Sequence, residues 1–175
     1  LFRSIALGEC QVGAILVKPA TPSALFDAIM QALHRDAAHR DVAGRKPHGP
    51  GRRFSGQRVL LVEDNEVNRE LAEEMLTGIG LNVDTAENGE IALRKVGATA
   101  YDLVLMDCHM PVMDGYTATE AIRRLPGTRH LPIVAMTANA LASDRERCLA
   151  VGMNDHIPKP IDITLLHDTL ARWLG

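Results

Sequence analysis

The sequence of 175 residues lacks any apolar stretch that reaches the roughly 18 residues needed to cross a bilayer. It also lacks the N-terminal pattern of basic residues, apolar core and cleavage site that marks a secretory signal. We therefore expect no membrane contact by this chain. Because the chain begins at Leu1 and not at Met, we expect it to be part of a longer protein.

Cysteine is also scarce. The three cysteines, Cys10, Cys108 and Cys148, are scattered and form no CxxC pair. This spacing predicts no zinc site and indicates a reducing compartment, so we expect a cytoplasmic location, with any membrane anchor in another part of the parent protein. Cys108 adjoins Asp107, and we interpret it as a packed neighbour and not as a nucleophile.

Charge is distributed unevenly along the chain. Residues 1–57 carry 8 basic and 4 acidic residues, whereas residues 58–175 carry 11 basic and 18 acidic residues. Since nucleic-acid-binding domains carry basic patches, the acidic balance of the larger part argues against nonspecific nucleic-acid binding. We therefore expect no nucleic-acid partner.

The N-terminal third of the chain divides into two parts. Residues 36–57 are rich in Gly and Pro and poor in apolar residues, which is typical of a flexible linker. Residues 1–35 contain a strand-like run that ends on Lys18, and the apolar spacing after Lys18 recurs after Lys159. The matching positions, 7, 11 and 15 residues after each lysine, are Leu25, Ile29 and Leu33, and Leu166, Leu170 and Leu174. We interpret residues 1–35 as the C-terminal remnant of an earlier copy of the domain in residues 58–175.

Residues 58–175 alternate short apolar runs with helical patterns in five strand–helix units. The first helical pattern has Val67, Leu71, Met75 and Ile79 at every fourth position, which predicts that this stripe faces the core. Strands that alternate with helices favour a parallel sheet with helices on both faces and right-handed crossovers. The predicted fold class is therefore α/β, with a doubly wound sheet of five parallel strands.

Polar side chains follow the apolar runs at four predicted strand ends. They are Glu63 and Asp64 after the first run, Asp107 after the third, Thr137 after the fourth and Lys159 after the fifth. In open α/β sheets, ligands bind just beyond the carboxyl ends of the strands, so we expect these side chains to converge. Three carboxylates form a hard-oxygen site for a divalent cation such as Mg²⁺. Lysine and hydroxyl groups supply hydrogen-bond donors for a phosphoryl group.

The order and spacing of these residues resemble the receiver domain of two-component response regulators. The segments VEDNEVNR, MDCHMPVMDG, MTANA and NDHIPKPID are most similar to receivers attached to hybrid sensor histidine kinases, and the match runs from Arg58 to Leu174. The resemblance implies a flavodoxin-like (βα)5 fold with strand order 2-1-3-4-5. It also implies that Asp107 takes a phosphoryl group from a phosphohistidine on a kinase dimerisation domain or a histidine phosphotransfer protein.

The metal ligands follow from the same resemblance. Asp64 and Asp107 would bind Mg²⁺ directly, and Glu63 would act through a water molecule. The backbone carbonyl of His109 would complete the set.

Phosphoryl contacts and a conformational switch are also implied by the resemblance. Lys159 and Thr137 would contact the phosphoryl oxygens, and the bond from Lys159 to Pro160 is expected to be cis. Thr137 and His156 would form the switch, in which a ring at position 156 moves inward as Thr137 engages phosphate. Many receivers have Tyr or Phe in place of His156.

Two alternatives remain open beside the phosphoacceptor. A Mg²⁺-dependent phosphohydrolase with an aspartyl-phosphate intermediate usually has a second Asp two residues after the nucleophile, where this chain has His109. A receiver used only for docking would not need the complete set of acidic, hydroxyl and lysine side chains. Because the chain shows no Gly-rich ATP-binding sequence and no phosphoacceptor-histidine helix, we do not expect it to be a kinase by itself. Its own reactions would be phosphotransfer to Asp107 and dephosphorylation.

Overall fold

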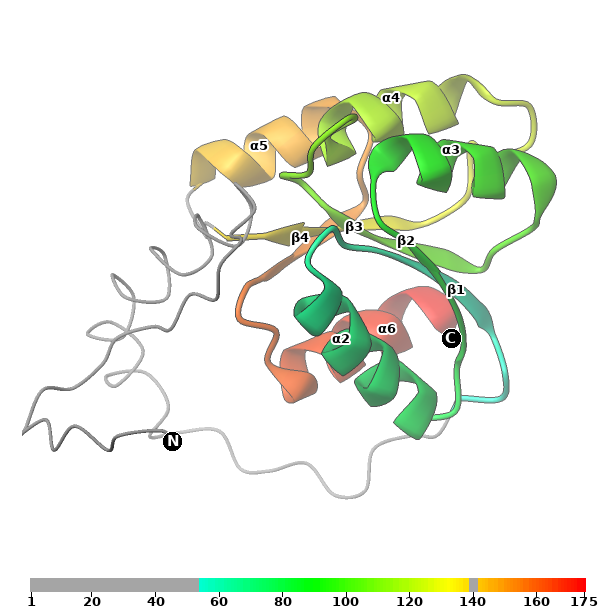
Figure 1. Cartoon of the computed structure of the whole chain (residues 1–175), viewed down its shortest axis with the longest axis vertical. Helices are drawn as coiled ribbons and strands as arrows, with labels where there is room; N and C mark the ends of the chain where they lie inside the picture. The colour runs from blue at the N-terminus through cyan, green and yellow to red at the C-terminus, as the bar shows by residue number, and fades with distance from the viewer. Residues whose placement is uncertain (1–53, 139–141) are drawn as a thin grey trace, which may run out of the picture.

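A computed structural model describes residues 54–138 and 142–175, in which five strands alternate with five helices (Figure 1). The expected unit in residues 1–35, and residues 36–53 of the expected linker, lie outside the described residues. No helix in the described ranges is long and apolar enough to cross a membrane. The strands are β1 (Arg58–Val62), β2 (Asn82–Ala86), β3 (Leu103–Asp107), β4 (Ile133–Thr137) and β5 (Asp155–Pro158). The helices are α2 (Glu66–Gly78), α3 (Gly89–Ala98), α4 (Gly115–Arg124), α5 (Ala142–Ala150) and α6 (Ile163–Leu174).

The five strands form one parallel sheet in the order β2-β1-β3-β4-β5, which confirms the predicted fold and strand order. Helices α3, α4 and α5 cover one face of the sheet, and α2 and α6 cover the other (Figure 1). The register pairs Val62 with Met106 and Asp107 with Met136. The carboxyl ends of β1, β3 and β4 therefore lie side by side at one edge.

The apolar runs are continuous because the central strands are buried on both faces. Leu60 and Val62 of β1 pack into the core under α3, α4 and α5, while Val59 and Leu61 pack into the core under α2 and α6. All five residues of β3 are buried. The strand that ends on Asp107 is thus fully enclosed, as is its neighbour β4.

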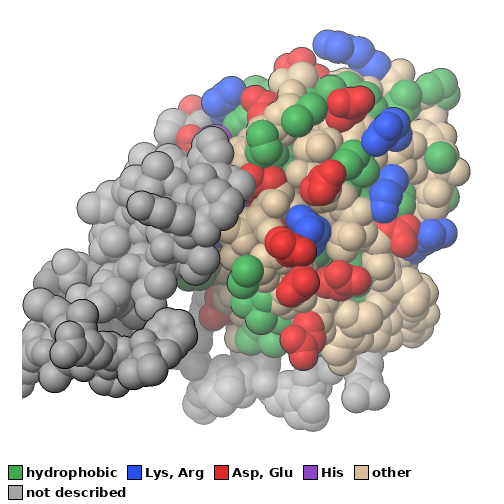
Figure 2. Space-filling view, in the orientation of Figure 1, with side chains coloured by type: hydrophobic (Ala, Val, Ile, Leu, Met, Phe, Trp, Pro, Cys, Tyr) green, Lys and Arg blue, Asp and Glu red, His purple; other side chains and the backbone are tan. Residues whose placement is uncertain are grey.

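The predicted buried stripe of α2 is wrong at its N-terminal end. Val67 is 72% exposed and Leu71 is 59% exposed, whereas Ala72 and Leu76 are buried. Each step of four residues advances about 40° past a full helical turn, so a stripe of that period winds away from the core. The start of α2 therefore presents hydrophobic side chains beside acidic ones on its outer face (Figure 2).

The packed unit begins before β1. Phe54 is buried, its backbone N–H donates to the carbonyl of Ile79 over 2.9 Å, and its ring lies 5.5 Å from that of His167. Gly80 has a φ of +98°, and a Cβ there would lie 2.4 Å from the carbonyl oxygen of Phe54. The last residues of the expected linker, from Phe54 onward, thus pack against α2 and α6.

Candidate functional site

Three carboxylates converge at the carboxyl edge of the sheet. Asp107 ends β3, and Glu63 and Asp64 follow β1. One oxygen from each of the three lies within 4.8 Å of the others, and Glu63 and Asp107 are each only 2% exposed. Like charges this close and this poorly solvated repel one another, so the cluster needs compensating positive charge.

Lys159 supplies part of that charge. Its Nζ lies 2.7 Å from Asp107 Oδ2 and 2.7 Å from Glu63 Oε2, and its side chain is 8% exposed. Loss of one partner of such a buried pair leaves an uncompensated charge, which is costly. The backbone N–H of Lys159 donates to the carbonyl of Thr137 over 2.7 Å, and the bond to Pro160 is cis, as the resemblance implies. The hydrogen bond between the ends of β4 and β5 thereby fixes the backbone position of Lys159.

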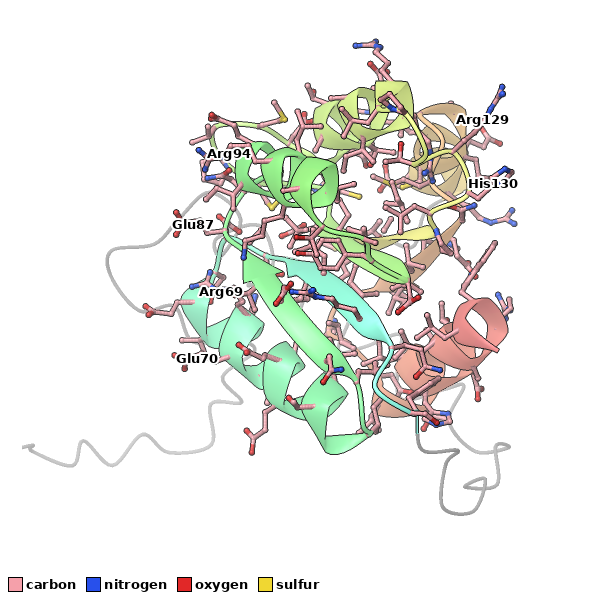
Figure 3. All side chains as sticks on the ribbon, turned by 90° about the vertical axis from the view of Figure 1, so that its right-hand side faces the viewer. Arg69, Glu70, Glu87, Arg94, Arg129 and His130 are labelled. Atoms are coloured by element: carbon pink, nitrogen blue, oxygen red, sulfur yellow. The ribbon has the colours of Figure 1, made fainter. Side chains whose placement is uncertain are left out.

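The first turn of α2 braces the acidic pair, which the sequence analysis did not anticipate. Asn65 caps α2 by accepting from the backbone N–H of Asn68 over 3.1 Å, and the Asn68 amide donates to Glu63 Oε1 over 3.3 Å. Arg69 Nη1 donates to the carbonyl of Glu63 over 3.0 Å. In Figure 3, Arg69 lies near Glu87, which directly follows the carboxyl end of β2. An Asn between an acidic pair and a helical pattern is the signal that would have indicated this cap.

The loop after β3 holds Asp107 from the other side. The backbone N–H of His109 donates to Asp107 Oδ1 over 3.0 Å, and Val112 has a φ of 69°, which is unfavourable for a β-branched residue. Asp114 caps α4, whose first residue is Gly115. A Cβ on Gly115 would lie 2.1 Å from the carbonyl oxygen of Asp107, so only glycine fits there without a shift. The carbonyl that the resemblance assigns to the metal site, that of His109, belongs to this loop.

The two expected switch residues occupy different surroundings. Thr137 ends β4 and is 1% exposed, one strand away from Asp107. His156 lies in β5 with its side chain 27% exposed, and its Nδ1 is 3.9 Å from Asp155 Oδ1. Asp155 also accepts hydrogen bonds from α6, through Arg172 and the indole of Trp173. In the chain, Thr137 precedes α5 and His156 follows it, so α5 lies between the two expected switch residues.

The geometry agrees with comparisons to known proteins. The sequence model of the response regulator receiver domain matches residues 59–171. The sensor protein GacS of Pseudomonas syringae pv. syringae is 38% identical over 161 residues, which are 90% of this chain but 17% of that protein. This chain therefore spans only a small part of that relative.

Two solved structures have the same fold. The receiver domain of the sensor histidine kinase PA1611 from Pseudomonas aeruginosa PAO1 is 48% identical, with a TM-score of 0.65 over 69% of this chain and 99% of that chain, and it has a magnesium ion in its active-site cleft. The Saccharomyces cerevisiae receiver of Ssk1, in complex with the histidine phosphotransfer protein Ypd1, is 28% identical, with a TM-score of 0.65 over 69% of this chain and 90% of that chain. The chain belongs to the response regulator receiver domain family and is similar to the receivers of sensor histidine kinases.

Proposed function

We propose that Asp107 accepts a phosphoryl group from a phosphohistidine in a phosphorelay. The contact that carries the proposal joins Lys159 Nζ to Asp107 Oδ2 over 2.7 Å, within a cluster of three carboxylates at the end of the central strand. A carboxylate can act as a covalent nucleophile when its surroundings neutralise the incoming negative charge. Asp107 supplies the carboxylate and Lys159 supplies positive charge, and β3 and β5 bring these two side chains to the carboxyl edge of the sheet.

The cation that fits this cluster is Mg²⁺. The side-chain donors of the cluster are all carboxylate oxygens, which hard divalent cations prefer, and they lie close enough together for one ion. Asp64 and Asp107 would bind it directly, Glu63 through water, and the carbonyl of His109 would complete the set. When bound, Mg²⁺ neutralises charge on the transferring group. The magnesium ion in the PA1611 receiver supports this choice.

The transfer needs one bond formed and one broken. An oxygen of Asp107 attacks phosphorus, and the phosphorus–nitrogen bond to the donor imidazole breaks, with its electron pair returning to nitrogen. The ammonium of Lys159 then pairs with the phosphoryl oxygens instead of the free carboxylate. Thr137 donates its hydroxyl hydrogen to one of these oxygens, and the ring of His156 moves inward.

The donor is a kinase dimerisation domain or a histidine phosphotransfer protein. The complex of a yeast receiver with Ypd1 supports the second kind. The parent protein is a hybrid sensor histidine kinase, and residues 1–35 are the end of a preceding receiver in tandem with this one. The similarity to GacS supports this assignment of the parent.

A labelling experiment tests the phosphoacceptor. The chain is incubated with Mg²⁺ and a small phosphodonor such as acetyl phosphate, and phosphate incorporation is measured with and without hydroxylamine, which cleaves acyl phosphates. The wild type should incorporate hydroxylamine-labile phosphate, and Asp107→Asn should not. Asp168→Asn, at an exposed position in α6, is the matched control and should label like the wild type. Equal labelling of Asp107→Asn would show that another residue is the acceptor.

A further inference from the structure

Two buried thiols meet beside the carboxylate cluster. Cys108 directly follows Asp107, and Cys148 lies on α5, 40 residues later in the chain. Their sulfur atoms are 3.9 Å apart, and both side chains are buried. Neither cysteine is in a disulfide. The fold thus brings together two thiols, one in the loop after β3 and one on α5.

The surroundings of Cys148 favour its thiolate. Its pKa is lowered, chiefly because the thiol of Cys108 can donate a hydrogen bond to it, while burial and the negative charge of Asp144 oppose this effect. The hydroxyl of Tyr116 and the positive charge of Arg147 act in the same direction as Cys108. The guanidinium of Arg147 lies 4.0 Å from the centre of the Tyr116 ring. Since thiolates are the nucleophilic form of cysteine, Cys148 is the better nucleophile of the pair.

A small hollow leads to Cys148. It has a volume of about 20 Å³ and lies between α5 and β5, next to His156. A space of this size holds roughly one water molecule. The remaining lining residues are Arg145, Leu149, Asn154 and Asp155. Cys148 lines this hollow, so an oxidant little larger than water, such as hydrogen peroxide, has a route toward this buried residue.

We propose that Cys108 and Cys148 are a peroxide-sensitive pair that oxidises to a disulfide between the loop after β3 and α5. The thiolate of Cys148 attacks one oxygen of hydrogen peroxide, the oxygen–oxygen bond breaks, and the leaving hydroxide takes a proton to become water. The sulfur of Cys108 then attacks the sulfenic acid at Cys148, the sulfur–oxygen bond breaks, and a second water leaves with the proton of Cys108. Two thiols are oxidised and one peroxide is reduced to two waters.

The disulfide would act on the loops of the carboxylate site. The sulfur atoms must close from 3.9 Å to about 2.0 Å, so Cys108 or α5 has to move. The backbone of Cys108 is hydrogen-bonded to β4 and to α4. Its N–H donates to the carbonyl of Met136, and its carbonyl accepts from the N–H of Gly115, each over 3.2 Å. Resting on the proposed function, we expect the cross-link to slow phosphorylation of Asp107.

The first arm of the test measures the thiols alone. The whole chain carrying Cys10→Ser, which leaves two cysteines, is treated with hydrogen peroxide, and free thiols are counted after unfolding. The count should fall from two to none, peptide mapping should find Cys108 joined to Cys148 within one chain, and dithiothreitol should restore both thiols. Cys148→Ala in the same background should form no internal link. Two free thiols after treatment, or oxyacids of cysteine without a link, would overturn the proposal.

The second arm measures coupling to the site. Labelling rates with acetyl phosphate are compared for the reduced, oxidised and re-reduced protein, and circular dichroism checks that each is folded. The oxidised form should label several-fold more slowly and recover on reduction, while peroxide should leave the rate of Cys148→Ala unchanged. Equal rates with the disulfide present would overturn the coupling. Absence of labelling in the reduced protein would instead count against the proposed function.

Discussion

Replacing Gly115 by alanine should destabilise the domain, because this glycine lies against the backbone of the central strand. The new Cβ would lie 2.1 Å from the carbonyl oxygen of Asp107 and 2.9 Å from Cγ of Met106. Overpacking of a core costs about 1–3 kcal/mol, and a contact with backbone belongs at the upper end. The better helix propensity of alanine, about 1 kcal/mol in a helix interior, offsets at most that much at the first residue of α4. We expect a net loss of about 2 kcal/mol in the free energy of unfolding.

Gly78 is the matched control for this substitution. It is also a helical glycine, at the end of α2, but a Cβ there would have no atom within 4 Å apart from its chain neighbours and the nearby backbone of its own helix. Gly78→Ala should therefore stabilise the domain by about 0.5–1 kcal/mol through helix propensity and a less flexible unfolded chain. Urea denaturation measures both, with the same m-value expected for each variant and the wild type. Midpoints that shift in the same direction for Gly115→Ala and Gly78→Ala would refute the reasoning.

Three further predictions concern pH, a buried arginine and the switch. Burial and a hydrogen bond to Asp84 raise the pKa of Tyr101 to about 12, so the unfolded chain loses this proton first. Stability should then fall as the pH rises from about 10 to 12, and Tyr101→Phe should remove that part of the decrease in urea titrations across this range; an unchanged slope would contradict it. Arg123 is half-buried and donates to several backbone carbonyls, so Arg123→Lys should lose about 1–3 kcal/mol, whereas Arg124→Lys, 78% exposed on the next position, should change stability by less than about 0.5 kcal/mol. Equal losses in thermal or urea unfolding would show that these carbonyl contacts contribute little. In Thr137→Ala, beryllofluoride should still bind, but amide NMR shifts far from the site within residues 137–160 should shrink, and undiminished shifts would exclude coupling through this hydroxyl.

Much of the fold could be predicted because the sheet is buried on both faces. Each strand then appears in the sequence as a short apolar run, and the polar residue that ends the run marks the edge of the sheet. Asp107 and Lys159 are 52 residues apart in the chain, yet they were expected to lie together because each follows an apolar run at the carboxyl end of a parallel strand. The carboxylate cluster was predictable for the same reason.

Contacts made by side chains that cross between elements could not be predicted in this way. The hydrogen bond from Arg69 to the carbonyl of Glu63 depends on how α2 is rotated about its axis. The spacing of apolar residues at every fourth position predicted a rotation that buries Leu71, which is exposed in the structure. The meeting of Cys108 and Cys148 depends on how α5 packs on β3, which the spacing of the two cysteines does not encode. Sequence reasoning placed Cys108 as a packed neighbour of Asp107, but it had no signal for the second sulfur.

The central claim is that phosphate from a histidine donor ends on Asp107. Its most direct measurement gives the chain a phosphorylated histidine phosphotransfer protein with Mg²⁺, then reduces the product with borohydride, which converts aspartyl phosphate to homoserine, and maps the peptides by mass spectrometry. We predict homoserine at position 107 only when the phosphorylated donor is present. Homoserine at Asp64 instead, or none at all from a donor that phosphorylates another receiver in the same buffer, would contradict the account.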